Sequence, residues 1–126
     1  MKKLVLLAYF LAISYASDPT KLKKLFDTYI DCLQELNVPE GWTPEVILCC
    51  LQKYEVIDEQ GLIKKDVFIQ NADGLISDKD RMYTATQIIN VCFEQAEKDS
   101  SKNNDEKTMA FIKCGSPGII LLDKFP

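Results

Sequence analysis

Five cysteines follow an N-terminal segment that has the features of a secretory leader, at positions 32, 49, 50, 92 and 114. Proteins sent to an oxidising compartment keep their cysteines paired, and an odd number must leave one thiol over. The sequence therefore predicts a small fold held by two disulfides, with one cysteine outside them.

The leader spans residues 1–16. It begins with two lysines, continues as an apolar run from Leu4 to Ile13, and ends with Ser14 and Ala16 at the positions of small residues that a signal peptidase needs. The apolar run is about half of the roughly 20 residues that a membrane-spanning helix requires. We therefore expect a cleaved signal peptide, a secreted and extracellular protein without membrane insertion, and one domain over residues 17–126.

The charge and residue content restrict the possible functions. Cleavage would leave 13 basic and 19 acidic side chains, a net charge of −6, whereas nucleic acids and anionic membranes attract basic proteins. The chain contains no histidine, which excludes Ser-His-Asp and Cys-His catalysis and histidine metal sites. We expect no enzyme activity, no catalytic or metal-binding residues, no cofactor and no nucleic-acid partner.

Apolar residues recur at helical spacing along the mature chain. The pattern predicts helices over 19–36, from 44 to about 54, around 63–68, from a capping box beginning at Ser77 to about Lys98, and from a cap at Asn104 to about Cys114. We expect an all-α protein, a compact bundle of about five or six short helices.

An apolar tail follows the predicted Gly-Ser-Pro-Gly hinge at residues 115–118. It contains Ile119, Ile120, Leu121, Leu122 and Phe125, too much apolar surface to leave in water. We expect it to fold back on the helices and form part of a pocket wall, with Leu122 or Phe125 nearest a ligand. The alternative is that it covers an outer groove.

Adjacent residues of a helix point about 100° apart, so Cys49 and Cys50 face different surroundings. Cys50 shares an apolar face with Val46 and Tyr54, whereas Cys49 lies among polar residues. This arrangement favours Cys50 as the buried partner in a disulfide.

Four paired cysteines allow three connectivities. We predict Cys32–Cys50 and Cys92–Cys114, because each pair joins successive helices. Cys49 would then be an inert thiol, or would form an intermolecular disulfide that makes a dimer.

Several large apolar and aromatic side chains occupy helix faces and are candidates to contact a ligand, together with two residues of the tail. They are Phe26, Tyr29, Tyr54, Phe68, Met82, Ile89, Phe93, Met109, Leu122 and Phe125. Periodicity alone does not distinguish a filled core from a lined cavity.

The segments around the first and third of these cysteines, residues 32–38 and 50–61, resemble those of insect odorant-binding proteins in their reduced-cysteine form. That family usually has six cysteines, and Val46 and Asp105 stand here where its second and fifth would be. Those two pair with each other, so the pattern matches the loss of one bridge. The gap from Cys32 to Cys50 is shorter than is usual, and Cys49 has no counterpart.

The resemblance implies that the helices surround a central hydrophobic cavity. The protein would carry a small hydrophobic ligand, such as an odorant, a pheromone or a lipid, through an aqueous fluid, with Tyr29 or Tyr54 orienting it. The alternative is a secreted helical interaction protein with a filled core, either monomeric or a dimer linked through Cys49.

Overall fold

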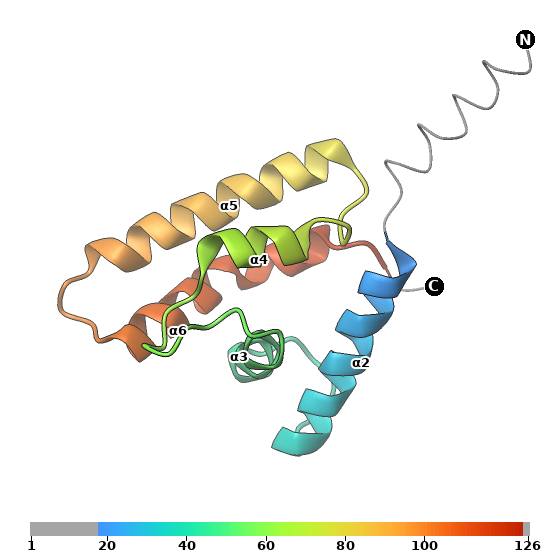
Figure 1. Cartoon of the computed structure of the whole chain (residues 1–126), viewed down its shortest axis with the longest axis horizontal. Helices are drawn as coiled ribbons and strands as arrows, with labels where there is room; N and C mark the ends of the chain where they lie inside the picture. Colours follow the sequence, from blue (N-terminus) through green and yellow to red (C-terminus); the bar gives the residue numbers. More distant parts are fainter. Residues whose placement is uncertain (1–17, 125–126) are drawn as a thin grey trace, which may run out of the picture.

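The computed structural model describes residues 18–124, which form five α-helices and a C-terminal 3₁₀ helix (Figure 1). The predicted leader at residues 1–16 and Phe125 lie outside this range. The all-α prediction is confirmed, since residues 18–124 contain no β-strand beyond an isolated antiparallel bridge between Ile57 and Ile63.

Helix α2 (Pro19–Leu36) begins and ends where the sequence predicts. The Asp18 carboxylate accepts hydrogen bonds from the Thr20 and Lys21 amides at 3.0 and 3.4 Å, and Pro19 occupies the first turn, where a missing N–H costs nothing. Asn37 closes the helix in the left-handed conformation, with a φ of 53°.

Helix α3 (Pro44–Lys53) is capped by the Thr43 hydroxyl and leads through an irregular loop to α4 (Lys65–Ala72). Gly61 in this loop has a φ of 89°, and a Cβ there would lie 2.6 Å from Asp105 Oδ1. The Gly61 carbonyl accepts a hydrogen bond from the buried Thr108 hydroxyl. The positive φ favours glycine at this position, and the Thr108 hydrogen bond fixes the loop against α6 (Asn104–Gly115).

Two predicted caps are wrong by one residue. Helix α5 (Lys79–Lys98) is capped by Asp78 rather than Ser77, and α6 (Asn104–Gly115) by Asn103 rather than Asn104. Each helix start has neighbouring polar residues that could cap it, and the extended backbone at Asp78 and Asn103 selects the one whose side chain reaches the free amides.

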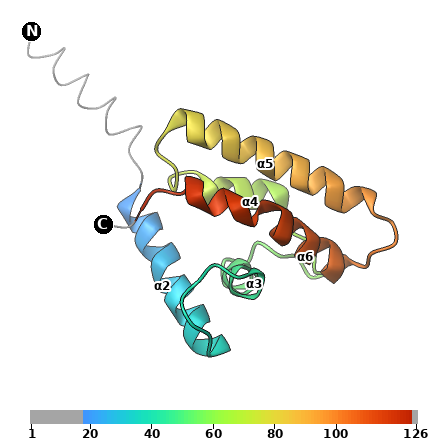
Figure 2. The same cartoon turned by 180° about the vertical axis from the view of Figure 1, so that it is seen from behind.

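Helices α2 and α3 form one group and helices α4, α5 and α6 form the other, and the two groups face each other (Figures 1 and 2). Helices α5 and α6 pack side by side, α2 packs on α3, and α3 also contacts α6. The two ends of the described chain meet at one short segment, because the Asp18 amide donates to the Gly74 carbonyl at 2.9 Å and the Asp123 amide to the Leu75 carbonyl at 2.8 Å.

The tail folds back on the bundle as predicted, but without the predicted hinge. Helix α6 runs through Gly115 and continues as the 3₁₀ helix η1 (Ser116–Leu121), which contacts both α5 and α6. Pro117 fits the first turn of η1, where its missing N–H has no intrahelical partner to lose.

One of the two predicted disulfides is correct. Cys92 and Cys114 join α5 to α6 as expected, with Cα atoms 5.6 Å apart. The predicted Cys32–Cys50 bond is wrong, because Cys32 pairs with Cys49 and leaves Cys50 as a buried free thiol.

The reason is that α2 packs on α3 with Cys32 facing Cys49, so that the Cα atoms of these two residues lie 5.9 Å apart. Lys53, one turn after Cys49, binds Glu35 on α2 at 2.6 Å, and Glu35 lies one turn after Cys32. The disulfide and the ion pair therefore run along the same helix–helix seam. Cys50 is buried, as its apolar neighbours predicted, and packs with Val46 in the same cluster as Tyr29 and Leu33 of α2 without forming a disulfide.

Candidate functional site

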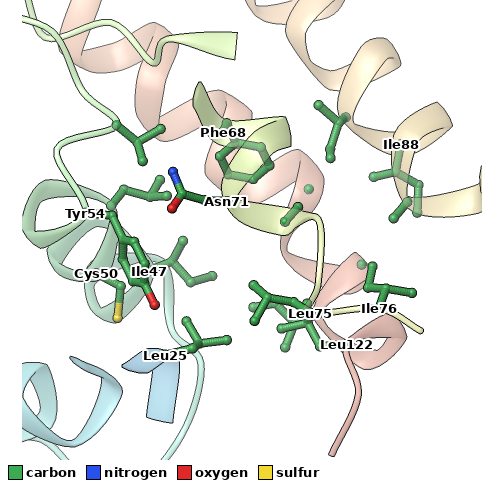
Figure 3. Close-up of a pocket in the computed structure, with 18 residues that line it drawn as sticks. Leu25, Ile47, Cys50, Tyr54, Phe68, Asn71, Leu75, Ile76, Ile88 and Leu122 are labelled. Atoms are coloured by element: carbon green, nitrogen blue, oxygen red, sulfur yellow. The ribbon is translucent and has the colours of Figure 1, made fainter. Parts of the chain in front are cut away.

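A pocket of about 170 Å³ lies between the two groups of helices (Figure 3). Every described helix contributes to its wall. Helices α2 to α4 and the segments that follow α3 and α4 supply Leu25, Ile47, Cys50, Leu51, Tyr54, Val56, Phe68, Asn71, Ala72, Leu75 and Ile76. Helices α5 and α6 and the tail supply Ala85, Ile88, Ile89, Gly115, Gly118, Ile119 and Leu122.

The wall contains no charged side chain and only three with a polar group, Cys50, Tyr54 and Asn71. All three belong to the α3 and α4 side of the pocket. Helices α5 and α6 and the tail present only aliphatic side chains and glycines. The site can therefore bury apolar surface and offers hydrogen bonds from one side only.

Asn71 and Tyr54 are the two oxygen-bearing side chains of the pocket. The Asn71 amide nitrogen donates one of its two hydrogens to the Val67 carbonyl at 2.9 Å, which leaves its second N–H and its amide oxygen to serve the pocket. Burial raises the pKa of the Tyr54 hydroxyl, which is therefore neutral at physiological pH. The Lys24 ammonium lies 4.7 Å from the centre of the Tyr54 ring.

Cys50 carries the one thiol of the described chain that is outside a disulfide. Its side chain is buried, and burial raises its pKa to about 11 against the opposing effect of the nearby Lys53 ammonium. Thiolates, not thiols, are the nucleophiles, so Cys50 is a packing residue and a weak hydrogen-bond donor near pH 7.

Four of the ten predicted ligand residues meet in this pocket: Tyr54, Phe68, Ile89 and Leu122. Tyr29 does not line it. Its hydroxyl accepts the Gly41 N–H at 2.6 Å, and its ring lies 4.4 Å from that of Trp42. Tyr29 thus fixes the loop after α2 and is not placed to orient a ligand in this pocket.

The remaining candidates lie elsewhere. Phe93 packs on Phe111 at 4.2 Å and lines a second cavity of about 140 Å³ whose wall includes Glu97 and Lys107. Three more, Phe26, Met82 and Met109, do not line either cavity, and Phe26 is 46% exposed. Phe125 lies outside the described residues.

Sequence reasoning missed most of the aliphatic wall and Asn71. Ile47 and Leu51 lie on the apolar stripe that predicted α3, so periodicity contained their signal. Asn71 sits in the last turn of α4, beyond the residues around 63–68 that predicted this helix. Gly115 and Gly118 were assigned to a hinge, whereas both leave space in the wall because they lack side chains.

Within residues 18–124 no helix is both long and apolar enough to cross a bilayer. The same residues contain no group of three or more cysteine or carboxylate side chains arranged to hold a metal ion.

Comparison with protein families gives one match. The family described as the ant venom allergen Sol i 2 family matches residues 31–119, which is more than half of the chain. This range includes all five cysteines and all but two of the pocket residues, Leu25 and Leu122. Comparison with curated proteins and with solved structures finds no match.

The match corrects the resemblance to insect odorant-binding proteins, since no family of that kind matches the chain. The resemblance depended on cysteine spacings along helices, and helical periodicity produces such spacings in unrelated proteins. The odorant-binding and olfactory roles that the resemblance implied therefore have no support.

Proposed function

The chain belongs to the ant venom allergen Sol i 2 family, and we propose that it is a secreted protein that carries a small hydrophobic molecule in the pocket between its helices. The observation that carries this proposal is the composition of the pocket wall. It is uncharged and mainly aliphatic, and it is built from every described helix. Venom is a secretion, which agrees with the leader that the sequence predicts.

An unfilled apolar space is unfavourable, because the atoms that line it lose dispersion contacts. An apolar ligand restores those contacts and removes its own surface from water, which is worth roughly 0.8 kcal/mol for each buried CH₂ group. Apolar cavities of about 150 Å³ in proteins accept molecules of the size of benzene. The pocket is therefore suited to ligands of about six carbon atoms.

The rival function is a secreted helical interaction protein with a filled core, and the disulfide pattern does not favour its form as a Cys49-linked dimer. Cys49 is bonded within the chain, and the remaining thiol, Cys50, is 4% exposed. The proposed carrier needs no catalysis and no cofactor.

Calorimetric titration with benzene and hexane, together with native mass spectrometry of the purified protein, tests the proposal. A Cβ added at Gly118 would meet Ile88 at 3.7 Å, an ordinary contact, so Gly118→Leu directs a side chain toward the pocket without a backbone clash. We expect saturable binding by the wild type and at least tenfold weaker binding by this variant. Gln87→Leu, an exposed change on α5, is the matched control and should bind like the wild type. No binding to the wild type would contradict the proposal.

A further inference from the structure

The polar groups of the pocket are gathered on one wall. Tyr54 follows the end of α3 and Asn71 lies in the last turn of α4, and both reach the pocket from the same side. Figure 3 shows the Asn71 amide directed toward the side where Tyr54 and Ile47 lie. Across the pocket, Ile88, Ile119 and Leu122 offer no hydrogen bond from their side chains.

The two oxygen-bearing groups have complementary capacities. The Asn71 nitrogen donates one of its two hydrogens to the Val67 carbonyl, which leaves a second N–H that can donate and an amide oxygen that can accept. The Tyr54 hydroxyl already shares a hydrogen bond with the Thr28 side chain, and its oxygen keeps a lone pair that can accept from a ligand. A ligand hydroxyl could therefore accept from the second N–H of Asn71 and donate to the Tyr54 oxygen. A carbonyl oxygen could use the Asn71 N–H alone, and a hydrocarbon could use neither group.

Charge is disfavoured throughout the pocket. Its wall holds no Asp, Glu, Lys or Arg to pair with an ionic ligand, and burying an unpaired charge costs far more than burying a hydroxyl. Burial raises the pKa of both Cys50 and Tyr54, so these groups are neutral at physiological pH and supply no charge either.

We propose that the pocket selects neutral amphiphiles that carry one hydroxyl group, with the hydroxyl on the wall that Tyr54 and Asn71 share and the hydrocarbon chain against Ile88, Ile119 and Leu122. This inference rests on the proposed function, because it names the class of molecule that the same pocket carries. It makes Tyr54 and Asn71 determinants of ligand specificity rather than of the fold.

Four six-carbon probes of similar size separate the possibilities at pH 7: 1-hexanol, hexane, hexanoate and hexylammonium. Each is titrated into the wild type and into Tyr54→Phe and Asn71→Leu, which remove a polar group with little change in volume. Tyr83→Phe is the control for the first variant, since Tyr83 is 67% exposed and off the pocket, and Gln87→Leu is the control for the second.

We expect each pocket variant to weaken 1-hexanol binding by about three- to tenfold, the effect of one lost hydrogen bond, and to change hexane binding by less than twofold. Both controls should leave all affinities unchanged. Hexanoate and hexylammonium should bind the wild type at least about 100-fold more weakly than 1-hexanol, because each must be buried as an unpaired ion.

The outcomes separate a failure of the hydroxyl selectivity from a failure of the proposed carrier function. If hexane and 1-hexanol both bind and neither variant changes their ratio, the hydroxyl selectivity is overturned and the carrier function stands. Tight binding of hexanoate or hexylammonium also overturns the proposed selectivity and leaves the carrier function standing. If no probe binds the wild type, the carrier function itself fails. If Asn71→Leu fails to fold, the 1-hexanol and hexane affinities of Tyr54→Phe decide whether the selectivity holds, because that change removes a single oxygen atom.

Discussion

The guanidinium of Arg81 on α5 binds the carboxylate of Asp123 at 2.8 Å, across 42 residues of sequence. The same guanidinium donates to the Leu121 carbonyl at 3.0 Å, and the same carboxylate accepts the Ser77 N–H at 3.1 Å. Asp123 is only 10% exposed at its side chain. This network holds the tail on the bundle, next to the pocket residue Leu122.

Replacing Asp123 by Asn should therefore cost more than replacing an ordinary surface carboxylate. We expect a loss of about 2 kcal/mol in the free energy of unfolding, measured by urea denaturation, because charge-assisted hydrogen bonds to a nearly buried group are lost. Glu94→Gln breaks the exposed Glu94–Lys98 pair and is the matched control. It should change stability little, since solvent screens that pair. Equal effects of the two substitutions would mean that the tail network adds no stability.

The tail offers a second matched pair of substitutions. Leu122 lines the pocket, whereas Ile120 in the preceding turn is 86% exposed. Leu122→Ala should lower stability by about 1–2 kcal/mol and change the affinity for hexane, because it removes part of the pocket wall. Ile120→Ala should do neither. Unchanged hexane affinity in a well-folded Leu122→Ala protein would assign the tail to covering an outer groove.

Peptide mapping without reduction should recover Cys32 linked to Cys49 and Cys92 linked to Cys114. Removing the first bond with the double change Cys32→Ala and Cys49→Ala should cost about 3 kcal/mol in the chain-entropy model, since the bond closes a loop with a sequence separation of 17. Cys50→Ala should keep both bonds and cost less. A Cys32–Cys50 peptide from the native protein would contradict the structure.

The Cys50 thiol makes stability depend on alkaline pH. Its folded pKa of about 11 lies above the ordinary value of 9.0, so the folded state holds this proton more tightly than the unfolded state does. Its contribution is complete below pH 9 and is lost as the pH rises from 9 to 11, by on the order of 2 kcal/mol.

Urea denaturation at pH 8 and pH 11 measures this loss, and the difference between wild type and Cys50→Ala isolates Cys50 from Tyr54 and Lys53, whose pKa values are also raised. A thiol reagent at pH 8 should modify Cys50 slowly in the native protein and rapidly in urea. Rapid modification of the native protein would show that the thiol is accessible.

Ligand affinity should be nearly flat between about pH 6 and pH 8. The chain has no histidine, the pocket wall has no carboxylate, and burial moves the pKa values of Cys50 and Tyr54 upward, away from neutrality. Titration of 1-hexanol at several pH values is the measurement. A drop centred near pH 6.5 would require a titrating group that the pocket wall lacks.

The sequence by itself determined the elements of this protein and several of their ends. Pro19 and Pro44, each after a capping residue, placed the starts of α2 and α3 correctly, because these signals act within one turn of helix. Helical periodicity also placed Cys92 and Cys114 on successive helices. The apolar composition of the tail predicted that it packs against the helices.

Only the tertiary structure decided which of two adjacent cysteines forms a disulfide, and which apolar side chains line the pocket. Residues 49 and 50 point about 100° apart, so the choice depends on which flank of α3 meets α2, a long-range property that helical periodicity does not contain. The same holds for Tyr29 and Tyr54. Both lie on apolar helix faces, yet one packs against Trp42 and the other borders the pocket. A periodic stripe specifies that a face is buried, whereas the crossing of the helices specifies what it is buried against.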